Sequence, residues 1–113
     1  MKALIAALLL VACTAHAESR AKSYEQCIAF ADMALVSSTL AKHGIARERA
    51  ATMLPDIYSL DDGDVKDIAG KILEAAYRRS SIDPAEPRAF ALALGNTCIK
   101  NGGRLEGFLG VKS

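Results

Sequence analysis

Three cysteines offer this chain its widest chemistry, because a thiol can form a disulfide, hold a metal ion or act as a nucleophile. Cys13 lies at the end of an apolar N-terminal run, while Cys27 and Cys98 stand 71 positions apart. None belongs to a Cys-x-x-Cys motif, the spacing typical of redox, zinc and c-type haem sites. We therefore expect a structural disulfide between Cys27 and Cys98. Two free buried thiols or intermolecular bonds are the alternatives.

A histidine and an acidic cluster are the other candidates for metal binding. His43 has no second histidine or cysteine at ligand spacing, and we interpret it as a residue at a helix C-terminus. The acidic cluster, residues 61–67, does not fit a calcium loop. With Gly63 at position 6 of such a loop, positions 1, 3 and 12 are Tyr58, Leu60 and Ala69. We interpret the cluster as the capped start of a helix and expect no metal site and no cofactor.

Residues suited to catalysis do not form a recognisable constellation. Nucleophilic catalysis needs a serine or cysteine beside a base, and the chain has no Gly-x-Ser-x-Gly motif. Asp32 interrupts the apolar run 28–36, and we interpret it as a surface position rather than a buried functional acid. We therefore expect no catalytic residues and no enzymatic activity.

The first 17 residues have the layout of a secretory signal peptide. A basic start, Met1-Lys2, precedes the apolar run Ala3–Ala12 and the small-residue site Ala15-His16-Ala17. The apolar run is too short for a membrane span, which needs about 20 residues. We expect residues 1–17 to be a signal peptide and residues 18–113 to be a single small helical domain in the periplasm or outside the cell. Disulfides form in those compartments.

A second interpretation of the N-terminus concerns Cys13. The sequence Leu10-Val11-Ala12-Cys13 resembles a bacterial lipobox, which implies a lipid-modified Cys13 as the first mature residue. The tether from Thr14 to Lys22 is short for a lipoprotein, so we favour cleavage after Ala17. Lipidation at Cys13, with anchoring in the cell envelope, remains the alternative.

Helical periodicity places Cys27 near the start of a central helix. Ser23 and Gln26 have the spacing of a capping box, and Gly44 is a natural stop. Cys27 then lies on a face of mostly small residues with Phe30. Larger residues flank that face, so we expect much of this helix to be enclosed; they include Ile28, Met33, Leu35, Val36 and Leu40.

The rest of the chain is predicted to be helical as well, giving an all-α, compact bundle of about four helices. Asp83, Pro84 and Glu86 have the types and order of a helix start, and Cys98 then lies near the end of that helix. The disulfide should join the first and last helices, which must run antiparallel. Residues 104–113 form a C-terminal tail that we expect to fold back over apolar surface. The four expected helices span residues 24–42, 47–58 (kinked at Pro55), 62–79 and 84–101.

Charge and layout narrow the function. Without Lys2 the chain has 13 basic and 13 acidic residues, which argues against a nucleic-acid partner. The layout resembles small periplasmic acid-stress chaperones and periplasmic immunity proteins, although no motif matches either group residue by residue. We expect a small exported bacterial cell-envelope protein that acts as a non-catalytic binding or interaction module with a protein partner. The alternatives are a periplasmic immunity or inhibitor protein against a secreted toxin, or a lipid-anchored accessory envelope protein that meets the membrane through Cys13.

Overall fold

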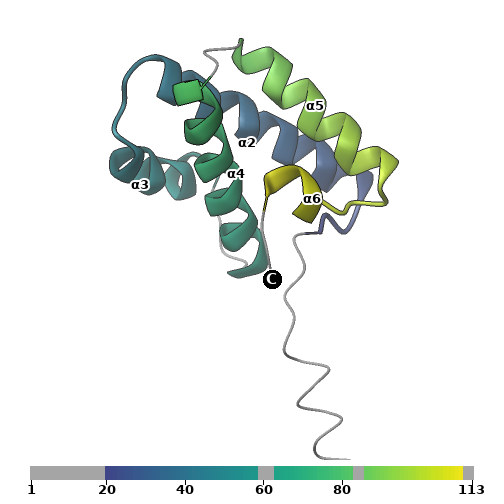
Figure 1. Cartoon of the computed structure of the whole chain (residues 1–113). Coiled ribbons are helices and arrows are strands. Elements are labelled where there is room, and N and C mark those ends of the chain that lie inside the picture. Colours follow the sequence, from purple (N-terminus) through teal and green to yellow (C-terminus); the bar gives the residue numbers. More distant parts are fainter. Residues whose placement is uncertain (1–19, 59–62, 83–85, 111–113) are drawn as a thin grey trace, which may run out of the picture.

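The protein is an all-α bundle arranged around its first long helix (Figure 1). The computed structural model describes residues 20–58, 63–82 and 86–110. Helices α5 and α4 both pack on α2, α3 packs mainly on α4, and the short α6 contacts α4. This arrangement confirms the predicted bundle with a central first helix. The helices are α2 (Tyr24–Lys42), α3 (Arg47–Tyr58), α4 (Gly63–Ile82), α5 (Pro87–Lys100) and α6 (Glu106–Leu109).

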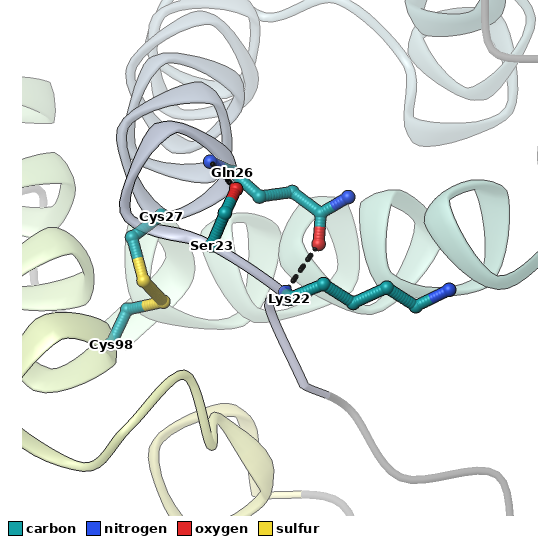
Figure 2. The surroundings of a disulfide bond; sticks show 5 residues. All are labelled: Lys22, Ser23, Gln26, Cys27 and Cys98. Atoms are coloured by element: carbon teal, nitrogen blue, oxygen red, sulfur yellow. Dashed lines mark hydrogen bonds between the residues drawn. A yellow bond between two sulfur atoms is a disulfide. The ribbon is translucent and has the colours of Figure 1, made fainter.

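Helix α2 has the predicted bounds, and its first turn is capped by side chains. Ser23 Oγ accepts a hydrogen bond from the Gln26 backbone N–H at 3.1 Å. The Gln26 side chain accepts from the N–H of Lys22 at 2.7 Å, one residue earlier than a standard capping box requires (Figure 2). One backbone donor in the first turn and one just before the helix are therefore satisfied.

Gly44 ends α2, as its position after the apolar pattern predicts. Its φ of +76° lies in the left-handed region, and its N–H bonds to the carbonyl of Ala41. The next N–H, of Ile45, reaches back to Leu40 at 3.0 Å. These two bonds form a Schellman motif, which satisfies carbonyl groups at the helix end.

Helix α3 has the predicted bounds and contains Pro55 in its last turns. Helix α4 differs from the prediction at its end. Helix α4 continues to Ile82 rather than ending at residue 79. No glycine or proline interrupts residues 80–82, so backbone hydrogen bonding continues beyond the expected helix end at residue 79. Asp61 and Asp62, the expected cap of α4, lie outside the described residues.

The expected start of α5 is wrong by three residues. The helix begins at Pro87, and Glu86 precedes it with an extended ψ of 132° and no side-chain capping bond. Steric conflict with a following proline ring disfavours helical geometry, so Glu86 cannot belong to the helix, whereas Pro87 suits its first position. Asp83 and Pro84, the expected start, lie outside the described residues.

The core lies where α2, α4 and α5 meet. Phe30, Ile72 and Leu94 are fully buried there, one from each of the three helices. A smaller apolar cluster fixes α3 to α4 through Ala50, Leu54 and Leu73. Many of the remaining buried residues are alanines, so the helices can approach closely.

The segment after α5 folds back onto this core, as expected. Leu105 and Leu109 are buried. The ring of Phe108 stacks on that of Phe90 with centroids 5.7 Å apart, and the Arg79 guanidinium lies 5.3 Å from the Phe90 centroid. This α6 segment therefore closes the edge of the bundle between α4 and α5.

Candidate binding surface

The disulfide joins the first turn of α2 to the last turn of α5 (Figure 2). The Cα atoms of Cys27 and Cys98 are 5.7 Å apart, and both residues are buried, with 3% and 0% of their surface exposed. A buried bond between two helices is a structural crosslink and offers no accessible thiol.

The seam between α2 and α5 is antiparallel and narrow. In Figure 1 the start of α2 lies beside the end of α5. Four residues after Cys27, Ala31 faces Gly95, at which a Cβ atom would lie 3.2 Å from that of Ala31. Two contacts, the Cys27–Cys98 bond and the Ala31–Gly95 approach, determine which residues of α2 and α5 lie side by side. We call two such residues level when they have the same height along the helix axes.

One apolar surface stands out on the described part of the chain. Six large apolar side chains are exposed there, and five of them belong to α2 or α5. We call these five the α2/α5 strip: Tyr24 (63% exposed), Ile28 (48%), Leu35 (37%), Leu92 (60%) and Ile99 (45%). The sixth, Ile57 (52%), is on α3.

Helix geometry puts the whole strip on one side of the seam. Each residue turns by about 100° around its helix, so Ile28 and Ile99 follow Cys27 and Cys98 on the same side of an antiparallel pair. Tyr24 and Leu35 have nearly the same angular position as Ile28. Leu92 lies two turns before Ile99. The core residues Phe30 and Leu94 point to the opposite side, towards α4, so the strip lies on the outer face of the pair.

Charges flank the two edges of this strip with opposite signs. Helix α2 carries the exposed Glu25 and Asp32 beside its apolar residues. Helix α5 carries the exposed Arg88 and Lys100 and has no acidic residue between Pro87 and Lys100. The first three turns of the α2 edge are therefore acidic and the α5 edge is basic, and Lys42 adds a basic group in the last turn of α2.

A hollow of about 490 Å³ lies at one end of the strip. It is lined by Tyr24 and Ile99 together with the basic residues Arg20 and Lys22, and by the disulfide at its side. Two strip residues from different helices thus border one depression, which confirms that they share a face.

Asp32 is exposed, as predicted, and it has a partner that the sequence pattern did not reveal. Its carboxylate accepts a hydrogen bond from the Tyr58 hydroxyl at 2.6 Å, linking α2 to the end of α3. Burial of the ring raises the pKa of the Tyr58 hydroxyl, and the bond to Asp32 and its charge raise it further. This pair therefore joins the end of α3 to the middle of α2.

A second, smaller hollow of about 280 Å³ lies between α3 and α4. Its lining includes Leu54, Pro55 and Leu73, with Lys66 as its charged member. Beside it, Arg47 of α3 bonds to Glu74 of α4 at 2.8 Å. An ion pair already joins the two helices across this region, so it is a weaker candidate for a binding surface than the strip.

The other residues considered from the sequence do not gather into a site. His43 is exposed and follows the last turn of α2, while Cys13 lies outside the described residues. Within the described ranges, no group of three or more histidine, cysteine, aspartate or glutamate residues is placed to hold a metal ion. No helix in those ranges is long and apolar enough to cross a membrane.

Comparisons of the chain with protein-family models, with curated proteins and with solved structures found no match.

Two strip residues correct an expectation. Ile28 and Leu35 were expected to be enclosed by neighbouring helices, yet both are exposed. The reason is that α4 and α5 cover only the inner face of α2, and no described element covers the outer face. A signal was present in the sequence, since Ile28 and Leu35 lie about 80–100° away from the face of Cys27.

Proposed function

We propose that this chain is a small exported protein of the bacterial cell envelope that acts as a non-catalytic binding module. Its binding surface is the α2/α5 strip. The observation that carries the proposal is the grouping of five of the six exposed large apolar side chains of the described residues on one face. Scattered single apolar residues are ordinary on a protein surface, but a contiguous group marks an interaction site.

The disulfide supports the cellular location. Such bonds persist in oxidising compartments and are rare in the cytosol. Together with the signal-peptide pattern at residues 1–17, it favours a mature protein in the periplasm or outside the cell. The intact mass of the mature protein tests this location. We expect a chain that begins at Glu18 and is not attached to the membrane. A diacylglyceryl group on Cys13 would instead mean that the protein is lipid-anchored.

Site-specific photo-crosslinking in living cells tests the binding surface. A photoreactive benzoylphenylalanine replaces Leu92 in the strip or, as the matched control, Ile57 on α3. Both positions are exposed to a similar degree, 60% and 52%, so they sample solvent equally. We expect one discrete adduct from position 92 and none from position 57. Equal or absent crosslinking from the two positions would contradict the proposal.

A further inference from the structure

The apolar and charged residues of the α2/α5 strip are arranged so that two copies of the strip can pack against each other. We propose that its occupant is a second copy of this chain, in a two-fold dimer that sets α2 of each copy against α5 of the other. This inference rests on the proposed binding function and names its partner. It follows from the levels of the apolar and charged residues along the seam.

The apolar residues match under this symmetry. A two-fold axis parallel to the helices keeps every residue at its own level and exchanges the positions of α2 and α5. The bond between Cys27 and Cys98 sets Ile28 level with Ile99, and the Ala31–Gly95 approach sets Leu35 level with Leu92. Each of these pairs then forms twice, once in each half of a four-helix arrangement.

The edge charges match as well. Glu25 lies two residues before Cys27, and Lys100 lies two residues after Cys98, so they stand at one level on opposite outer edges. The symmetry brings Glu25 of one copy to the edge that carries Lys100 of the other. Opposite charges there favour this pairing and disfavour the arrangement that sets each helix against its own copy.

The charges also argue against a lipid surface as the occupant. An anionic bilayer attracts a patch with a basic border on all sides. Here Glu25 and Asp32 line one long edge of the strip, so that edge would be repelled. A second copy instead places the oppositely charged Lys100 beside Glu25.

The size of the face predicts a weak dimer. Helix α5, the shorter of the two, is roughly 21 Å long, and two helices side by side are roughly 20 Å wide, which gives about 400 Å² per copy. The total of about 800 Å² is smaller than a standard specific interface, so we expect a transient dimer that forms at high protein concentration.

Analytical ultracentrifugation of the mature, oxidised chain tests the proposal over concentrations from about 1 µM to about 1 mM. We expect a reversible monomer–dimer equilibrium. The Ile28→Glu and Leu92→Glu variants should each weaken it at least tenfold, because a buried carboxylate without a partner is costly. Ile57→Glu, with an equally exposed side chain on α3, is the control and should leave it unchanged.

Exchanging the charges of Glu25 and Lys100 tests how α2 of one copy is aligned with α5 of the other. Glu25→Lys and Lys100→Glu should each weaken the dimer several-fold, and the double variant should restore it. Both residues are exposed, so these changes leave the fold intact. A monomer at every concentration, a dimer indifferent to the strip variants, or a double variant without rescue would overturn the proposal. A monomer that binds anionic vesicles through the strip would overturn it too.

The crosslinking experiment separates this inference from the function on which it rests. An adduct from position 92 with twice the mass of the chain supports both. An adduct to a different protein, from a chain that stays monomeric, overturns the dimer and leaves the binding function standing.

Discussion

Gly103 has a backbone role that no other residue type can fill. Its φ is +94°, and a Cβ atom there would collide with the carbonyl group of Ala21. In return, the Gly103 carbonyl accepts a hydrogen bond from the Ala21 N–H at 2.8 Å. This contact ties the segment before α2 to the segment after α5.

We expect Gly103→Ala to destabilise the protein by about 2 kcal/mol or more, because the substitution combines a disfavoured φ with backbone overlap. Urea unfolding followed by circular dichroism measures the loss. Gly107→Ala is the control, since nothing lies near its Cβ position and its φ is not positive. It should be neutral or slightly stabilising.

Tyr58 links stability to alkaline pH. Its pKa is raised in the folded state, so the neutral hydroxyl stabilises the fold fully below the unfolded value of about 10. That contribution is lost as the pH rises above 10, because only the unfolded chain releases the proton readily.

Tyr58→Phe should cost about 1 kcal/mol at neutral pH, the net value of one hydrogen bond. It should also reduce the loss of stability between about pH 10 and pH 11. Unfolding free energies at pH 7, 10 and 11 measure both effects. The control Tyr24→Phe, at an exposed ring, should change stability at pH 7 by less than about 0.5 kcal/mol. An identical pH profile in the Tyr58 variant would show that the bond to Asp32 does not form.

At the scale of elements, the short helix α6 makes a large apolar contribution to the stability of the fold. Leu109 is buried, and its carbonyl accepts a hydrogen bond from the Arg78 side chain at 2.8 Å. Leu109→Ala should therefore destabilise the fold by about 2–4 kcal/mol. Leu92→Ala removes an exposed leucine and should cost less than about 0.5 kcal/mol in dilute solution. Equal effects of the two variants would mean that α6 does not pack on the core.

The elements that sequence reasoning located well are those with local signals at both ends. Ser23 and Gly44 mark the two ends of α2 through hydrogen bonds within a few residues, so the sequence pattern alone predicts this helix. The start of α5 was misplaced because two prolines, Pro84 and Pro87, both suit a first helical position. Only the extended backbone of Glu86 decides between them.

The candidate surface was harder to predict than the helices. An apolar residue beside a helix face is buried if a neighbouring helix covers it and exposed if none does. The angular positions of Ile28 and Leu35 show that they lie off the Cys27 face, but they do not show whether another helix covers them. The Tyr58–Asp32 bond has the same difficulty, because it joins side chains 26 positions apart. Such contacts depend on how α3 docks, which no local pattern specifies.

At the scale of the whole molecule, the disulfide is the main covalent constraint. On the chain-entropy model, a closed loop of this length stabilises the fold by about 4 kcal/mol. A domain of this size has a total stability of about 5–15 kcal/mol, so the reduced protein should be only marginally folded.

Reduction by dithiothreitol should therefore lower the urea midpoint strongly and raise the slope of the unfolding transition, because the reduced unfolded chain exposes more surface. Comparing oxidised and reduced wild-type protein keeps both sulfur atoms in the core, which a cysteine-to-alanine variant would not. Equal midpoints in the two states would show that the bond contributes nothing to stability.

The placement of this bond also determines how the protein responds to force. Arg20 and Arg104 lie side by side in a backbone bridge, and the bond between Cys27 and Cys98 closes just inside them. When the oxidised chain is pulled by its two ends, the load passes from the first turn of α2 through the sulfur atoms to the last turn of α5. Only the chain outside residues 27–98 can extend, so α3 and α4 carry no tension. A single-molecule pulling trace should lengthen by the whole loop only after reduction.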